Sequence, residues 1–239
     1  MRGMLAGLIA GLCAIAFAKI VAEPQISHAE NFERQAQIAA GRPLENPLVS
    51  RDVQDTIGLG VGVAFAGIAL GGLFGLGFAA AYRRLSQARA KTMALLLAGA
   101  AFLAVFLIPF LKYPANPPSI GNPDTIGRRT ATYFLLIAVG LLSVAMALTV
   151  RRLATRGLGP WNASLLGVAV GVAIVVVAYL VMPGFNEVPT GFPPTVLWQF
   201  RLASAGTQLT LWGALGLVFG ELTERREGRD RRAAQAVSA

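Results

Sequence analysis

The sequence predicts an all-α fold, a polytopic bundle of membrane-spanning helices. Of the 239 residues, 55% are hydrophobic and only 14% are charged, with a mean hydropathy of +0.60, whereas a soluble domain carries about a quarter charged residues. Six apolar runs are each long enough to cross the bilayer core as a helix, which takes roughly 20 residues. None of these runs alternates apolar and polar residues as a barrel strand would. These observations exclude a water-soluble enzyme, a disordered chain and a collagen-like chain.

The predicted spans coincide with the apolar runs, because lipid offers unpaired backbone groups no hydrogen-bond partner and so requires helices. They cover residues 3–22, 56–81, 92–111, 130–150, 163–182 and 197–220. Residues 1–220 thus form a transmembrane bundle with outer loops at 23–55, 112–129 and 183–196. Residues 221–239 form a basic cytoplasmic tail, which we interpret as an anchor on anionic membrane lipid rather than a nucleic-acid-binding arm.

The first span needs a separate decision, because it resembles a secretory signal. Arg2 precedes the apolar stretch, and residues 16–18 (Ala-Phe-Ala) imitate a cleavage site. Lys19 directly after that site, and the apolar residues 20–22 beyond it, favour an uncleaved helix. Cleavage would leave five spans.

Basic residues predict the orientation, with the N- and C-termini both in the cytoplasm. In that orientation the inner segments hold thirteen of the 21 Lys and Arg residues and four of the 12 Asp and Glu residues. The whole net charge of +9 then faces the cytoplasm, as the positive-inside rule requires. We therefore expect a multi-pass protein of the bacterial inner (plasma) membrane.

The segment after the first span carries three candidate metal ligands. Pro24 suits the first turn of a helix, and Glu23, His28 and Glu30 lie along that helix. Imidazole and carboxylate groups bind Co²⁺, Ni²⁺ or Zn²⁺. Because His28 has no carboxylate three or four positions away, a site also needs a ligand from another loop or another polypeptide. The alternative is a helix that lies on the outer surface and binds no metal.

The second outer loop supplies polar atoms for a translocation pathway. Four prolines in residues 112–129 restrict its backbone. Asn116, Asn122 and Asp124 supply oxygens that could line a pore mouth, and Lys112 is a further pathway candidate. Two alternatives stay open: Lys112 extends its charge to the interface, and Asp124 or Thr125 caps the next helix.

The third outer loop and the last span contribute the remaining candidates. Glu187, the only charge in its loop, is the fourth candidate metal ligand. Arg201, Ser204 and Gln208 share one face of the last span, and polar residues inside a membrane mark a pathway or a buried partner. We expect Arg201 to pair with Glu187, either along the pathway or as a structural clamp.

Other functions lack the residues they need. One cysteine excludes a disulfide framework and a cysteine metal cluster. The chain has no nucleotide-binding loop, dinucleotide fingerprint or HExxH motif, and nothing argues for a Ser-His-Asp set around one histidine. We expect no enzyme activity, no cofactor and no ATP hydrolysis, so transport would draw on an ion gradient, the membrane potential or another subunit.

Glycines four residues apart predict close helix packing. They are Gly3, Gly7 and Gly11, then Gly67, Gly71 and Gly75, then Gly167 and Gly171, and Gly216 and Gly220. The packing lies within the chain or between copies of it, the second case giving a homo-oligomer.

Motifs in the outer segments carry a family resemblance. They are residues 110–118 (Phe-Leu-Lys-Tyr-Pro-Ala-Asn-Pro-Pro), Val188-Pro189 with Phe192-Pro193, residues 197–204 (Leu-Trp-Gln-Phe-Arg-Leu-Ala-Ser), and residues 21–24 (Val-Ala-Glu-Pro) followed by Ala29-Glu30. These motifs resemble the CbtA family of predicted cobalt transporter subunits, over essentially the whole chain except the basic tail. Glu23, Lys112, Asn116 and Arg201 match its pattern. The resemblance implies cobalt uptake linked to cobalamin synthesis, with a small single-span partner, CbtB, that carries histidine.

We therefore expect a membrane subunit that helps to move Co²⁺ inward. The outer acids would concentrate the cation, and Glu23, His28 and Glu187 would remove its waters in stages. The alternative is a non-transporting scaffold that stabilises another membrane complex through its glycine faces.

Overall fold

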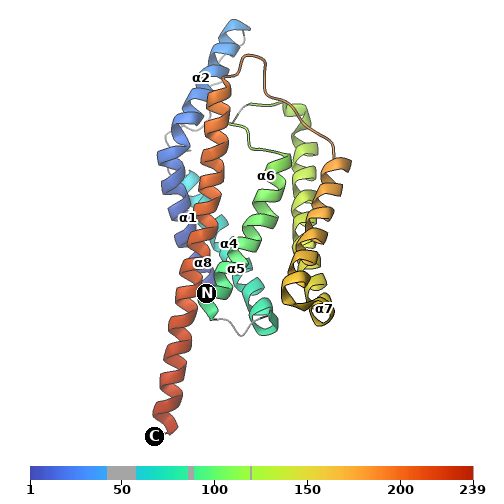
Figure 1. The fold of residues 1–239 in the computed structure, drawn as a ribbon. Coiled ribbons are helices and arrows are strands. Elements are labelled where there is room, and N and C mark those ends of the chain that lie inside the picture. Colours follow the sequence, from blue (N-terminus) through green and yellow to red (C-terminus); the bar gives the residue numbers. More distant parts are fainter. Residues whose placement is uncertain (42–57, 86–88, 119, 239) are drawn as a thin grey trace. The chain divides into compact units, whose positions relative to one another are not determined.

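Every regular element of the described residues is a helix, which confirms the predicted fold class. The structure is a computed structural model that describes residues 1–41, 58–85, 89–118 and 120–238. The loop residues 42–55 and the start of the second predicted span lie outside them. The elements are α1 (Arg2–Val21), α2 (Glu23–Ala39), α4 (Leu59–Leu85), α5 (Ala90–Ala101), the π-helix η2 (Phe102–Leu107), α6 (Ile108–Lys112), the 3₁₀-helix η3 (Pro123–Thr125), α7 (Ile126–Val181) and α8 (Pro194–Ser238) (Figure 1).

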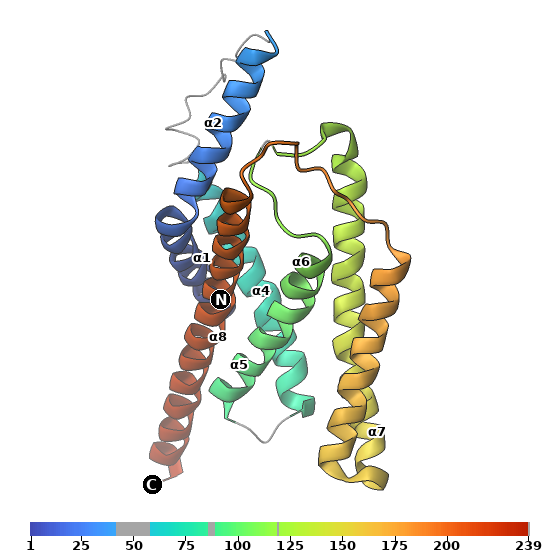
Figure 2. The same cartoon turned by 45° about the horizontal axis from the view of Figure 1, so that its top comes forward.

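In the described ranges, five helices are long and apolar enough to cross a membrane, and each of the six predicted runs overlaps one of them. The difference in number comes from α7, whose 56 residues would extend about 84 Å if straight. Its backbone departs from helical geometry at Gly159 (φ 73°), directly before Pro160. Both ribbon views show α7 turning back on itself as a hairpin (Figures 1 and 2). The two arms hold the predicted spans 130–150 and 163–182.

The chain divides into two compact units. One comprises Met1–Gly99 with Leu202–Ala239, and the other comprises Ala100–Arg201. Both borders fall inside helices, one in α5 and one in α8.

In the first unit, glycines bring α1 and α4 into backbone contact. A Cβ added at Gly7 would lie 2.0 Å from the carbonyl oxygen of Gly67, and one at Gly3 would lie 2.2 Å from that of Gly71. Gly11, further along α1, faces Val63, so the two helices run antiparallel. The predicted close packing is therefore present within the chain.

The first unit also contains the contact between α8 and the start of α5. Lys91 Nζ lies 3.0 Å from Glu221 Oε2, and the Lys91 backbone N–H donates to Glu224 Oε1 at 3.3 Å. Arg225 Nε donates to Glu221 at 2.7 Å. The Glu224 carboxylate on α8 thus accepts a hydrogen bond from a backbone N–H in the first turn of α5. N–H groups in a first turn have no acceptor within their own helix. All four residues belong to segments predicted to face the cytoplasm.

In the second unit, small residues hold the two arms of α7 together. A Cβ at Gly167 would lie 2.4 Å from the carbonyl oxygen of Ala147, and the buried Ser143 hydroxyl donates to the Gly171 carbonyl at 3.0 Å. Gly140 faces the backbone of Ala104 in the same way. The hairpin therefore brings the first and last turns of α7 to the same end of this unit.

Two helices begin earlier than their apolar runs suggest. The last residues of the predicted loop 112–129 form the first turn of α7, which starts at Ile126. Likewise α8 starts at Pro194, inside the predicted loop 183–196. The apolar runs do not extend to these first turns, although proline suits the first position of a helix.

Candidate functional site

Hydrogen bonds in the second unit connect α6 and the predicted loop 112–129 to the end of α7 and the predicted loop 183–196. Lys112 Nζ donates to the Tyr179 carbonyl at 2.8 Å, and the Tyr179 hydroxyl donates in return to the Ile108 carbonyl. The next residue, Tyr113, donates its hydroxyl to the Pro183 carbonyl at 2.7 Å. Lys112, a predicted pathway residue, is thus engaged in connecting α6 to the end of α7.

Glu187 connects the third loop to the start of α7. Its Oε1 lies 2.5 Å from the Thr125 hydroxyl, and its Oε2 accepts the Asn122 backbone N–H at 3.1 Å. Arg129 Nε lies 3.2 Å from the same Oε2, as an ion pair without hydrogen-bond alignment. The Thr125 hydroxyl, together with the Asn122 N–H and the Arg129 charge, lowers the pKa of Glu187, although desolvation opposes the shift. Both oxygens of this carboxylate therefore already have partners.

The position of Glu187 has an electrostatic reason. The first turn of α7 carries no acid but contains Arg128 and Arg129, although a helix N-terminus favours negative charge. Glu187 supplies that charge from a distant loop. The prediction that Glu187 pairs with Arg201 is wrong, because its cationic partner is Arg129.

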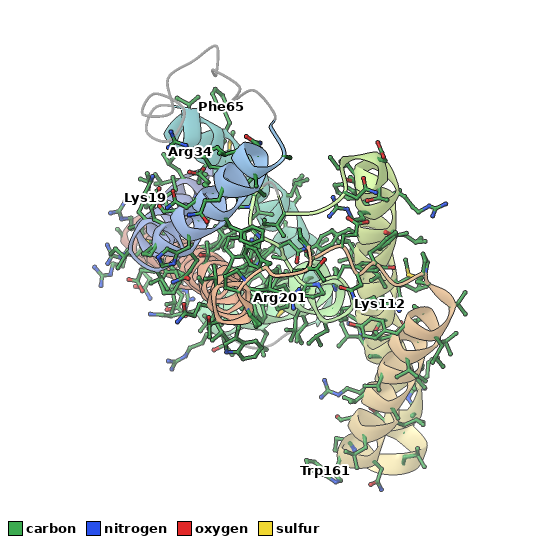
Figure 3. All side chains as sticks on the ribbon, turned by 90° about the horizontal axis from the view of Figure 1, so that it is seen from above. Lys19, Arg34, Phe65, Lys112, Trp161 and Arg201 are labelled. Carbon is green, nitrogen blue, oxygen red and sulfur yellow. The ribbon has the colours of Figure 1, made fainter. Side chains whose placement is uncertain are left out.

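Arg201 instead binds the second loop through neutral oxygens. Its Nε donates to the Ala115 carbonyl and its Nη2 to Asn116 Oδ1, both at 3.2 Å. Figure 3 shows Arg201 where α8 follows the third loop, and Lys112 nearer α7. The structure thus brings together two predicted pathway residues, Arg201 and Asn116.

These segments surround a cavity of about 480 Å³ within the second unit, a size typical of small-molecule sites. Its wall combines aromatic, amide and charged side chains, among them Tyr113, Tyr133, Phe134, Phe185, Asn116, Asn186, Arg129, Glu187 and Arg201. Among the described residues, two guanidinium groups and one carboxylate thus line the cavity.

Asp124 is exposed and does not line this cavity. Its backbone N–H bonds to Asn122 Oδ1 at 3.0 Å, forming a tight turn before the helix. Thr125 occupies the N-cap position of α7 but makes no side-chain cap bond. Its hydroxyl instead contacts Glu187 and the Asn122 carbonyl.

The other candidate metal ligands lie on α2, in the first unit. Glu23 pairs with Lys19 at 3.1 Å, His28 is exposed and Glu30 is half-buried. Among the described residues, no three His, Cys, Asp or Glu side chains come together in a group that could hold a metal ion. The metal assignment therefore stays a prediction that needs further ligands.

Ser204 and Gln208 are half-buried on α8, in the first unit. They follow Arg201 on one face of the helix, as the spacing predicts. Their role in a pathway stays a prediction.

Three residues of the cavity wall, Arg129, Tyr133 and Phe185, were not predicted from the sequence. A signal for Arg129 was present, since two arginines in the first turn of a helix need an anion from elsewhere. The positive φ of Gly121 (146°) was not visible in the sequence, and a Cβ there would lie 3.0 Å from Arg129 Nη1. No comparable signal marked the two aromatic residues.

Of the comparisons with known proteins, one finds a match, to a family model. No curated protein and no solved structure matches this chain. A family model described as "Probable cobalt transporter subunit (CbtA)" matches residues 1–224. It covers every described apolar helix through the membrane-spanning part of α8, and a subunit implies at least one partner. The chain therefore belongs to the CbtA family of probable cobalt transporter subunits.

Proposed function

We propose that this protein is a membrane subunit of a cobalt uptake system in the bacterial inner membrane. That system supplies Co²⁺ for cobalamin synthesis. The observation that carries the proposal is the family match over residues 1–224. The five long apolar helices support it, because a hydrated cation needs a protein-lined route through about 30 Å of hydrocarbon.

Ligands on α2 are suited to the first contact with the cation. His28 is exposed, and Glu23 and Glu30 precede and follow it on the same helix. These residues do not form a complete set, so the partner, a small single-span CbtB-like subunit, supplies additional imidazole. Glu187 can join such a site only after releasing Thr125, Asn122 and Arg129.

Flux through liposomes tests the transport function. The full chain is reconstituted alone and with the partner, and entry of Co²⁺, Ni²⁺ and Zn²⁺ is followed under an imposed membrane potential. We expect Co²⁺ entry with both subunits present. Absence of metal flux in both preparations would instead support the scaffold alternative.

Substitutions on α2 test the ligands separately. We expect His28→Ala and Glu30→Gln each to reduce Co²⁺ entry at least about tenfold, as loss of a metal-supporting residue does. Ser27→Ala, at an exposed neighbouring position, is the matched control and should transport normally. Normal entry with both ligand variants would refute the site and leave transport itself standing.

The scaffold alternative loses the feature that suggested it. Gly3 and Gly7 face Gly71 and Gly67, Gly167 faces Ala147, and Gly216 approaches Ala98, all inside the chain. These glycine faces are therefore already occupied by helices of the same protein.

A further inference from the structure

The cavity of the second unit has the wrong charge for a bare cation. Arg129 and Arg201 line it, and Glu187 is the only carboxylate among the described residues that do so. We propose that this cavity binds an oxyanion, a carboxylate or phosphate group, through the guanidinium of Arg201. The proposal goes beyond cobalt transport and does not depend on it.

The first step is that Glu187 does not neutralise Arg201. One of its oxygens meets the Thr125 hydroxyl, and the other meets the Asn122 N–H and the Arg129 guanidinium. The negative charge of Glu187 is thus matched by Arg129 within the same cluster.

The second step concerns the unused donors of Arg201. Its Nε and Nη2 donate to the neutral oxygens of Ala115 and Asn116. Within the described part of the chain its Nη1 has no acceptor, and no carboxylate forms an ion pair with it. Arginine stays charged at any physiological pH, and a half-buried charge without a counter-ion is costly. An oxyanion supplies both the charge and two acceptor atoms with the spacing that a guanidinium fits.

The third step concerns the rest of the wall. The two amide groups in the wall, from Asn116 and Asn186, are uncharged and leave the local charge positive. Tyr133 contributes a hydroxyl and an aromatic ring, and Phe185 contributes a second ring. The volume of about 480 Å³ accommodates more than a single inorganic ion. The chemistry fits a small organic acid, inorganic phosphate or the phosphate of a lipid headgroup.

Calorimetry on the full chain tests the proposal. The protein in an uncharged maltoside detergent is titrated with succinate and with inorganic phosphate up to about 10 mM, the range of a weak site. The neutral analogue succinamide is titrated in parallel. The same protein in nanodiscs of phosphatidylcholine, with and without phosphatidylglycerol, tests whether lipid phosphate competes for the site.

Two variants that each remove one positive charge distinguish a specific role of Arg201 from a general effect of the protein's charge. Arg201→Gln removes the proposed donor, whereas Arg128→Gln removes an exposed arginine that does not line the cavity. We expect Arg201→Gln to weaken oxyanion binding roughly tenfold or more, as loss of a charge-assisted hydrogen bond does. Arg128→Gln should bind as the wild type does.

The outcomes are decisive even if Arg201→Gln does not fold. Binding of succinate or phosphate but not succinamide by the wild type supports the site, and displacement by anionic lipid identifies a headgroup as the ligand. The proposal is overturned if no oxyanion binds in detergent and anionic nanodiscs give no protection of Arg201 from phenylglyoxal. Equal binding of succinate and succinamide, or equal weakening by the two variants, overturns it as well.

Discussion

The contact between α1 and α4 has no space for a methyl group at Gly7, which makes Gly7→Ala a quantitative test of the packing. A Cβ at this position would lie 2.0 Å from the Gly67 carbonyl oxygen and 2.8 Å from the Gly71 Cα. Cβ atoms in real structures essentially never approach other heavy atoms closer than 3.0 Å. The two helices must therefore separate locally by about 1 Å, which loses a quarter to a half of the dispersion energy of that contact. Overpacking costs about 1–3 kcal/mol, and a backbone neighbour that cannot rotate away places the cost near 3 kcal/mol. Because alanine gains up to about 1 kcal/mol of helix propensity over glycine, we expect a net loss of about 2 kcal/mol.

The matched control is Gly62→Ala on α4, where nothing lies within 4 Å of the added Cβ. It should stabilise the helix by up to about 1 kcal/mol. Thermal unfolding of the full chain in detergent, followed by fluorescence with the buried Trp212 as reporter, should then separate the two variants by about 6–12 °C. Intact mass verifies that the purified protein retains Gly7. If that residue is present and both variants unfold at one temperature, the close-packed interface is refuted.

Three further predictions concern the second unit, each measured by unfolding of the full chain in detergent. The pKa of Glu187 is lowered from 4.5, so its contribution to stability is complete above pH 4.5 and is lost as the pH falls through the lowered pKa. In that pH range the wild type should lose stability more steeply than Glu187→Gln, and parallel stability profiles of the two proteins would contradict this. Gly159→Ala places a Cβ on a residue with φ 73° and ψ 165°, a region that essentially only glycine adopts, and should cost about 1–3 kcal/mol. Gly157→Ala, with open space and an ordinary φ, should cost nothing. Tyr179→Phe removes a hydroxyl donor and should cost about 1 kcal/mol; a similar cost for Tyr133→Phe would show that the hydrogen bond is not the cause.

The helices could be predicted from the sequence because their cause is local. Any run of about 20 apolar residues in lipid must satisfy its backbone within itself, so hydropathy locates residues 130–150 and 163–182 without knowledge of their neighbours. The turn at Gly159 is also local, and the sequence shows it: Arg151, Arg152 and Arg156 end the apolar run, and Gly159-Pro160 follows them. The structure describes the two predicted spans as one helix, α7, because only Gly159 departs from helical geometry between them.

The candidate site could be predicted only in part, because its cause is not local. The loops that hold Asn116 and Glu187 were identified as functional segments, but partners 58 residues apart, such as Arg129 and Glu187, are not visible in spacing. They meet because the α7 hairpin returns the chain to the end where it began. The choice of Arg201 as the partner of Glu187 failed for this reason, since charge alone did not distinguish between two arginines near the outer loops.

The length of α8 has a mechanical consequence. Its 45 residues extend about 68 Å, more than twice the thickness of the hydrocarbon core. Ion pairs one turn apart, such as Glu221–Arg225 at 2.7 Å, lie along the part beyond the predicted span. The family match stops at residue 224, whereas the helix continues to Ser238. A molecule that binds the distal basic turns can therefore act on the rest of the helix. A lateral force applied there would change the tilt of the membrane-embedded portion of α8.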